Sequence, residues 1–242
     1  MSVFVSRLSF FAAALVILAL TVRGAPAQDA RQNQSGNFDF YVLTLSWSPS
    51  FCEAAAERAG DRTTVHREQC GDRPFSFVVH GLWPQYDRGF PEYCQVPAPR
   101  LNRNIVSSML DLMPSPRLIF HEWDRHGTCS GLNARAYFDN VRRARAVVKI
   151  PEAYTDVRSY LTVTPDDVEE AFVKANPGMT RAGISVACDS RRLNEIRICI
   201  GKDLKFRDCE ESERRACRRD KLVMPPVRRA TERQAGASVT VN

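Results

Sequence analysis

The sequence predicts an α+β domain, in which strands and helices occupy separate stretches of the chain. A nearly continuous apolar run at residues 38–47 and an alternating run at residues 75–80 predict strands. Helical periodicity dominates residues 102–176, and short strand-like runs return over residues 183–209. This grouping of strands and helices is typical of the α+β class.

The first predicted strand, residues 38–47 (F-D-F-Y-V-L-T-L-S-W), has apolar residues on both faces. Such a pattern indicates a central strand that is covered on both sides. Residues 48–50 (S-P-S) end the strand. Residues 53–60 then form a short helix or a loop, and residues 71–74 form a turn.

The second predicted strand, residues 75–80, places Phe77 and Val79 on one face and His80 on the other. We expect the strand to end at His80, because Gly81 lets the backbone turn. A strand end is a rigid place to mount a catalytic side chain.

Several helices should follow the second strand. Residues 102–113 repeat apolar side chains at helical spacing and stop before Pro114, and Pro116 can start the next helix. The remaining predicted elements are helices over residues 133–149 and 164–176, the latter capped by Thr164, and short strands over residues 183–188, 195–201 and 204–209.

The segment of residues 120–130 (F-H-E-W-D-R-H-G-T-C-S) holds two of the four histidines. On a helix, four of its ionisable side chains fall within about 140° of arc: His121, Glu122, Arg125 and His126. We expect Gly127 to end this helix in a left-handed turn. A solvated, mixed-charge face would explain any one of these residues, but a third histidine, His80, lies in the apolar segment 77–85 and favours a shared site.

These side chains are suited to moving protons near a phosphate. One imidazole can remove the proton of a ribose 2′-hydroxyl while another protonates the departing 5′-oxygen, which leaves a 2′,3′-cyclic phosphate. Arg125 can stabilise the charge that develops on the phosphate oxygens. The formal net charge of +6 at pH 7 is weak evidence for a polyanionic partner.

Two competing kinds of chemistry fit the sequence less well. The H-E-x-x-x-H spacing separates His121 and His126 by more arc than the H-E-x-x-H zinc motif does. A serine hydrolase would want a nucleophile motif such as G-x-S-x-G, which the chain lacks.

The amino terminus resembles a secretory signal. Arg7 precedes an apolar run at residues 8–22, and small residues follow at 24–27. The run is roughly 15 residues long, whereas a membrane-spanning helix needs about 20. We therefore expect residues 1–27 to be a signal peptide and the remaining chain to be exported, to a periplasm or out of the cell.

The cysteines fit an exported protein. All eight lie after residue 27, and an even number in an oxidising compartment predicts four disulfides: Cys52, Cys70, Cys94, Cys129, Cys188, Cys199, Cys209 and Cys217. Zinc ligation or a nucleophilic thiol is less well supported, because no C-x-x-C pair occurs. Spacing alone leaves about 105 possible pairings open.

Two segments resemble the active-site segments of the ribonuclease T2 family. They are H-G-L-W-P at residues 80–84 and H-E-W-D-R-H-G-T-C at residues 121–129, and Y-V-L-T-L-S-W-S-P-S-F-C at residues 41–52 resembles the family's first strand. The resemblance covers most of residues 38 to about 217. It implies an α+β fold with a central antiparallel sheet packed by helices and stabilised by disulfides. It also implies cleavage of single-stranded RNA with low base specificity and no metal or other cofactor.

The family's residue roles carry over to matching positions. His80 resembles the general acid, His126 the general base, and Glu122 the group that stabilises the pentacovalent state. His121 would contact phosphate, and Trp83 would stack on a base. Arg125 occupies a position that is usually lysine in the family, which keeps the charge but changes the shape of the cation.

The resemblance also implies the disulfides and the extent of the domain. The implied pairs are Cys94–Cys129, which would clamp the catalytic helix, Cys188–Cys217, Cys199–Cys209 and Cys52–Cys70. We expect a flexible amino terminus over residues 28–37, one catalytic domain over residues 38–227, and a disordered tail over residues 228–242.

We therefore predict a monomeric, metal-independent endoribonuclease that needs no protein partner and no membrane after export. An exported RNA-binding or cytotoxic protein with little turnover is the first alternative, and a metal-dependent phosphodiesterase is the second. A protein that only binds RNA has no need of three titratable groups at His80, Glu122 and His126.

Overall fold

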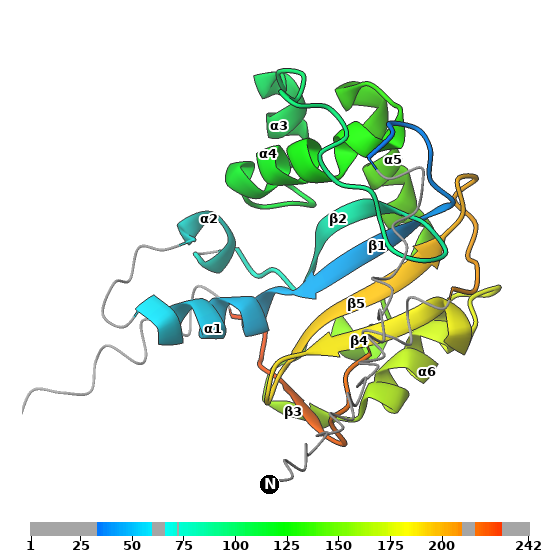
Figure 1. Ribbon diagram of the computed structural model, residues 1–242. Coiled ribbons are helices and arrows are strands. Elements are labelled where there is room, and N and C mark those ends of the chain that lie inside the picture. Colours follow the sequence, from blue (N-terminus) through cyan, green and yellow to red (C-terminus); the bar gives the residue numbers. More distant parts are fainter. Residues whose placement is uncertain (1–32, 60–65, 72, 210–215, 229–242) are drawn as a thin grey trace, which may run out of the picture.

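The computed structural model describes residues 33–59, 66–71, 73–209 and 216–228. At its centre lies a four-stranded antiparallel sheet with the strand order β2-β1-β5-β4 (Figure 1). The strands are β1 (Phe40–Trp47), β2 (Phe77–Gln85), β4 (Ile184–Cys188) and β5 (Leu193–Ile200). The α+β class and the central antiparallel sheet are thereby confirmed.

Strand β1 pairs with β2 on one edge and with β5 on the other. Leu43 and Leu45 lie in the main core, while Phe40 and Val42 belong to a second, smaller apolar cluster with the Cys199–Cys209 disulfide. Both faces of β1 are therefore covered, which explains its nearly continuous apolar sequence.

The helices cover the sheet in separate groups. Helices α3 (Arg103–Met109), α4 (Pro116–Arg125) and α5 (Ala134–Val147) lie together on the side of β1 and β2 (Figure 1). Helix α6 (Pro165–Ala175) packs against β4. Helices α1 (Ser48–Ala59) and α2 (Arg67–Cys70) continue from the end of β1, and single 3₁₀ turns occupy Gly127–Ser130, Glu152–Tyr154 and Arg181–Gly183.

Helix starts follow the local capping rules. The side chain of Thr164 accepts a hydrogen bond from the backbone N–H of Asp167, whose carboxylate accepts one in return from the N–H of Thr164. Asn102 and Asn133 cap α3 and α5 in the same way with their side-chain oxygens.

One prediction about the strands was wrong, and two short strands were not predicted. Residues 204–209 do not form a strand, because only an isolated bridge joins Phe206 to Ile200. Two short strands, β3 (Leu161–Val163) and β6 (Leu222–Met224), instead form a second antiparallel sheet that the sequence did not indicate. Three-residue strands have too few positions to show an alternating pattern.

The helix expected over residues 102–113 ends at Met109. The following residues turn so that the carbonyl oxygen of Leu112 accepts a hydrogen bond of 2.9 Å from the backbone N–H of Val79 in β2. A tertiary contact with the sheet thus takes the place of the helix's last turn.

The structure describes only parts of the two ends of the chain. The expected signal peptide at residues 1–27 and nearly all of the expected tail lie outside the described residues. Of the amino-terminal stretch 28–37, residues 33–37 are described, and Ser35 and Gly36 are hydrogen-bonded to the turn after α4. Among the described residues, no helix combines the length and apolarity needed to cross a membrane.

Candidate active site

His80 lies in the middle of β2 and not at a strand end, so that prediction was wrong. The pairing of β1 with β2 shifts between Thr44, opposite Gly81, and Leu45, opposite Val79. His80 is the residue left without a partner, at a β-bulge. Bulges re-aim a side chain without ending the strand, which is why the sequence pattern suggested a strand end here.

Gly81 makes room for the groups beside His80. A Cβ atom at this position would lie 2.0 Å from Oε2 of Glu122 and 2.3 Å from Nε1 of Trp83. Both distances are far below any real contact. At Gly81 the backbone of β2 therefore carries no side chain, which leaves space for the carboxylate of Glu122 from α4.

Glu122 is presented by the last turn of α4, a helix capped by the Ser115 hydroxyl. Its side chain is 1% exposed, with Oε1 3.6 Å from Nε2 of His80. Oε2 accepts a hydrogen bond of 2.7 Å from Nε1 of Trp83. Burial raises the pKa of Glu122 to about 7, against the opposing effects of His80 and of the Trp83 hydrogen bond.

His126 follows the last residue of α4 and is 6% exposed. Its Nδ1 has no hydrogen-bond partner among the described residues. Burial lowers its pKa to about 3, and the charges of Arg125, His121 and His80 act in the same direction. This imidazole is neutral at ordinary pH.

Gly127 does not end the helix in a left-handed turn, so this prediction was also wrong. It begins the 3₁₀ turn Gly127–Ser130, and the left-handed residue is Gly131, with φ of 75°. Gly127 is required for another reason. A Cβ there would lie 2.5 Å from the ring of Trp123 and 2.9 Å from that of Tyr137, so the glycine lets the turn pack against the core.

His80 shows the opposite electrostatic behaviour to His126. Burial acts to lower its pKa, but the hydrogen bond and charge of Glu195 and the charge of Glu122 outweigh burial and raise it above the usual value. Nδ1 of His80 lies 2.6 Å from Oε1 of Glu195, on β5. This imidazole therefore favours the protonated state.

Trp83 connects the predicted site residues. Its ring centroid lies 5.3 Å from that of His80 and 5.2 Å from that of His126, and its N–H holds Glu122. The structure thus brings His80, Glu122 and His126 around one indole ring. Trp47 and Trp123, in contrast, are core residues.

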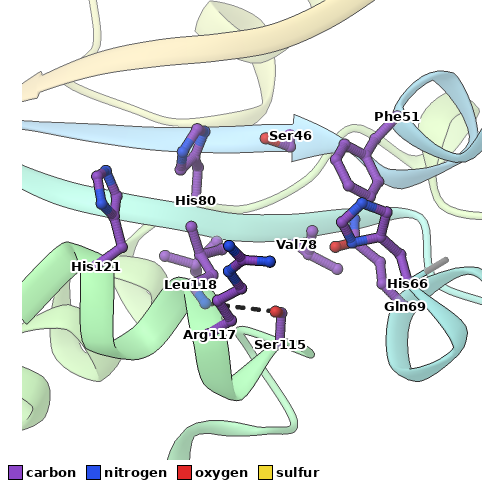
Figure 2. A pocket seen from close by; sticks show the side chains of 11 residues that line it. Ser46, Phe51, His66, Gln69, Val78, His80, Ser115, Arg117, Leu118 and His121 are labelled. Atoms are coloured by element: carbon purple, nitrogen blue, oxygen red, sulfur yellow. Dashed lines mark hydrogen bonds between the residues drawn. The ribbon is translucent and has the colours of Figure 1, made fainter. Parts of the chain in front are cut away.

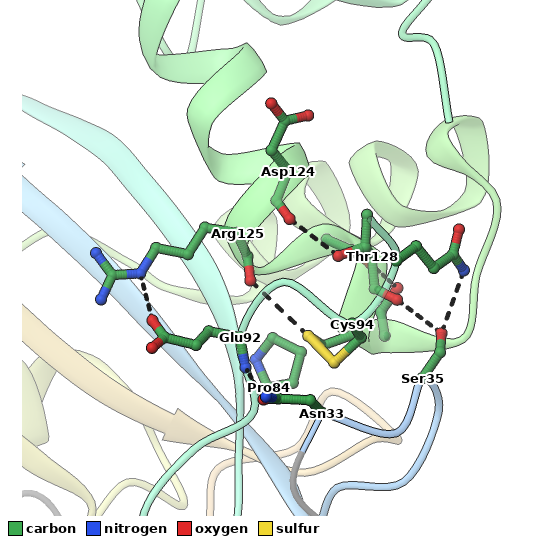
Figure 3. Close-up of a disulfide and its surroundings, with 12 residues drawn as sticks. Asn33, Ser35, Pro84, Glu92, Cys94, Asp124, Arg125 and Thr128 are labelled. Carbon is green, nitrogen blue, oxygen red and sulfur yellow. Dashed lines mark hydrogen bonds and ion pairs between the residues drawn. A yellow bond between two sulfur atoms is a disulfide. The ribbon is translucent and has the colours of Figure 1, made fainter. Parts of the chain in front are cut away.

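His121 and Arg125 lie on either side of this centre. Burial, with the charges of Arg125 and His80, lowers the pKa of His121. The Nε of Arg125 donates a hydrogen bond of 2.9 Å to the carboxylate of Glu92 (Figure 3).

A pocket of about 290 Å³ opens beside His80 and His121. Figure 2 shows these two imidazoles at one end and the ring of Phe51, edge-on to His66, at the other. The remaining lining residues come from β1, β2, α2 and α4: Ser46, Gln69, Val78, Val79, Ser115, Arg117 and Leu118.

The turn that carries His126 is held from outside by a disulfide. Cys129 is bonded to Cys94 (Figure 3). The backbone N–H of Tyr93 donates to the carbonyl of Arg125. Ser35 donates its hydroxyl to the carbonyl of Thr128. The other disulfides are Cys52–Cys70, Cys188–Cys217 and Cys199–Cys209, so the four bonds have the pairings that the resemblance implies.

One residue of the site was missed by sequence reasoning. Glu195 stands in a predicted strand, with Arg197 two positions later on the same face. Two charged residues on one face of an otherwise apolar strand are a signal of a buried ion pair. Nothing in the sequence shows that His80 is their neighbour.

The fold and site define a class: an α+β protein with two histidines of opposed pKa beside a buried glutamate. A sequence profile of the ribonuclease T2 family matches residues 38–209, and the chain belongs to that family. It is 30% identical over 186 residues to a probable ribonuclease of Haemophilus influenzae, covering 74% of this chain and 64% of that protein. It is 26% identical to ribonuclease I of Escherichia coli, covering 79% and 86%.

The chain spans less than two thirds of the first of these relatives, and 42% of a ribonuclease of Aeromonas hydrophila that is 44% identical over 102 residues. Among solved structures, the fold is similar to an RNase-related protein from Calystegia sepium, with a TM-score of 0.62 and 19% identity. That match covers 79% of this chain and 98% of the other.

Proposed function

We propose that the protein is an endoribonuclease that cleaves single-stranded RNA by acid/base transphosphorylation, with low base specificity. His126 takes the proton of the ribose 2′-hydroxyl, and the oxygen attacks the adjacent phosphorus. His80 gives a proton to the departing 5′-oxygen. One P–O bond forms and one breaks, and the products are a 2′,3′-cyclic phosphate and a free 5′-hydroxyl.

The observation that carries this proposal is the opposed pKa of the two histidines. A general base must be unprotonated and a general acid protonated before the reaction starts. Burial lowers the pKa of His126 to about 3, and Glu195 and Glu122 hold the pKa of His80 above its usual value. The two shifts favour a neutral His126 and a protonated His80, which are the states that cyclisation needs.

The neighbouring groups have supporting roles in the proposal. Glu122, with a pKa of about 7, can donate or accept a hydrogen bond as charge shifts on the phosphorane oxygens. His121 contacts the phosphate from the mouth of the pocket. Arg125 adds positive charge while its Nε is paired with Glu92.

Trp83 was expected to stack on a base. In the structure its ring is already in contact with both imidazoles, and its N–H is bonded to Glu122. We therefore assign Trp83 a second role, which is to hold Glu122 beside His80. The pocket lined by Phe51 offers a further aromatic face for a base.

The decisive experiment is cleavage of a defined dinucleotide by a His126→Ala variant. We expect a loss of at least about 100-fold in kcat with an unchanged melting curve, and partial recovery when imidazole is added. Undiminished cleavage would contradict the roles proposed here. If the wild type does not cleave RNA and the variant binds RNA as tightly as the wild type, the RNA-binding alternative is favoured.

Two controls separate the proposed reaction from metal-dependent cleavage. We expect full activity in EDTA and no cleavage of the matching DNA, which lacks the attacking hydroxyl. The first product at early times should carry a 2′,3′-cyclic phosphate. Loss of activity in EDTA, or a linear phosphate as first product, would support the metal-dependent phosphodiesterase.

We also propose that the enzyme acts as an exported monomer. Four disulfides among the described residues suit an oxidising compartment. Cell fractionation and size-exclusion chromatography would test these two statements.

A further inference from the structure

The strongest interaction made by His80 is with a residue outside the two histidine segments. Its Nδ1 lies 2.6 Å from Oε1 of Glu195, whereas its Nε2 lies 3.6 Å from Glu122. Glu195 is 115 residues away in sequence and belongs to β5, which is separated from β2 by the whole of β1. A contact across two strand spacings requires a particular local arrangement.

The sheet provides that arrangement with small side chains and a bulge. Glu195 is opposite Ser46 of β1, and Arg197 is opposite Thr44. These β1 side chains are short, so they leave the face between β2 and β5 open. The bulge turns His80 over β1 toward this gap, where Figure 2 shows it on the same side as Ser46.

Glu195 is itself held in place. Arg197 donates from Nη2 and Nε to its Oε2, at 2.8 Å and 3.2 Å, while Oε1 remains for His80. The Glu195 side chain is 13% exposed. Burial raises its pKa, but the hydrogen bonds and charges of His80 and Arg197 prevail, so the net shift is downward and the carboxylate stays ionised.

We propose that Glu195 is the positioning residue of His80, and that Arg197 fixes Glu195 for this task. The carboxylate accepts the hydrogen on Nδ1 and keeps it there. Only the proton on Nε2 is then free to leave, and it goes to the 5′-oxygen as the P–O bond breaks. An acidic partner on the far nitrogen fixes tautomer and ring orientation in the same manner in other acid/base sites. This inference rests on the proposed function.

Several other charged or titratable groups face His80 and must be considered in any pH dependence. Glu122, His121 and Arg117 come from α4, His126 follows that helix, His66 precedes α2, and Arg197 joins Glu195 on β5. Glu195 and Arg197 lie on β5, outside the catalytic segments, and Glu195 is hydrogen-bonded to both His80 and Arg197. Changing Glu195 or Arg197 tests the positioning role without removing a proposed catalytic group.

The test compares kcat and KM from pH 4.5 to 9 for the full chain and two variants. Glu195→Gln should move the alkaline limb of kcat/KM to lower pH, with a loss on the order of tenfold at pH 8 and less than about threefold at pH 5. The loss should appear in kcat and not in KM. Arg197→Gln should move the same limb to higher pH, because the charge of Arg197 lowers the pKa of His80.

An ion pair that lies away from His80 should not shift the alkaline limb in either direction. Glu169→Gln is the matched control, since Glu169 is another buried glutamate paired with an arginine but lies on α6. It should leave the pH profile unchanged. If the wild type cleaves RNA and Glu195→Gln leaves the alkaline limb of kcat/KM unchanged, the proposal is overturned.

The histidine NMR titration separates this outcome from failure of the proposed function. If the wild type does not cleave RNA, the proposed function is lost, yet the titration still reports on the pair. The His80 resonance of Glu195→Gln should titrate at lower pH than in wild type. Equal titration in both proteins would show that Glu195 does not control His80.

Discussion

Glu122 is a carboxylic acid that the fold removes almost completely from water. Its neighbours are His80, the indole N–H of Trp83 and the bare backbone at Gly81. An ionised carboxylate in such a place is stabilised less than it would be in water, so its pKa rises to about 7. The fold thus brings to about 7 the pKa of a group that would otherwise titrate near 4.5.

This placement has a cost for stability that depends on pH. The folded-state pKa lies above the unfolded value, so the folded protein binds the proton more tightly. The stabilisation is complete below about pH 4.5 and is lost as the pH rises through about 7. Above that range the buried charge works against the fold.

We therefore expect Glu122→Gln to be more stable than wild type at pH 8, by up to about 3 kcal/mol, and equally stable at pH 4. The neutral amide can keep the hydrogen bond from Trp83 and carries no buried charge. The rate of RNA cleavage should fall on the order of 100-fold. Urea unfolding at both pH values and initial-rate assays check this, and a variant that is less stable at pH 8 would contradict it.

At the scale of elements, the site depends on how α4 ends. The helix delivers Glu122 and Arg125 from its last turn, and His126 follows just beyond it. The 3₁₀ turn Gly127–Ser130 then packs against the core, and Cys129 ties it to Cys94. The disulfide constrains the position of His126 more directly than it constrains the fold.

Replacing both cysteines of this bond, Cys94→Ala with Cys129→Ala, should lower the free energy of unfolding by about 4 kcal/mol and also lower kcat. Cys188→Ala with Cys217→Ala is the matched control. Its bond spans 29 residues against 35, so the loss of stability should be similar, but the site should keep its kcat. Thermal melting and cleavage rates at 15 °C check this. Equal kcat in both double variants would contradict the prediction that the Cys94–Cys129 bond positions His126.

At the scale of the whole molecule, the carboxyl-terminal strand closes the structure. Leu222 and Met224 of β6 are fully buried. Beyond them, the carbonyl oxygen of Pro225 accepts a hydrogen bond of 3.0 Å from Nε1 of Trp47, 178 residues earlier. The last described residues thus secure the end of the central strand β1.

A chain that ends after Asp220 should fail to fold stably. Two buried apolar side chains contribute about 1.5–3 kcal/mol each, and with the lost hydrogen bonds this approaches the 5–15 kcal/mol that holds an ordinary domain together. A chain that ends after Arg228 should keep both its melting temperature and its RNase activity. Circular dichroism melts of the two truncations check this. A stable, active 220-residue chain would show that β6 is dispensable.

Much of the fold could be read from local patterns. The two-faced apolar run of β1, the helical spacing over residues 133–149 and the Thr164 cap of α6 each predicted an element that the structure contains. Such signals work because they depend on neighbours within a few residues along the chain. The three-residue strands β3 and β6 carry no such signal, and they form because distant segments meet.

The amino-acid sequence by itself determined which side chains could move protons, because residue type sets that chemistry and because His80, Glu122 and His126 stand in two distinctive segments. Only the tertiary structure decided their protonation states. Burial lowers the pKa of His126 and raises that of Glu122, while Glu195 raises that of His80 from two strands away. Charge and solvent act through space, so the order of residues along the chain cannot reveal them.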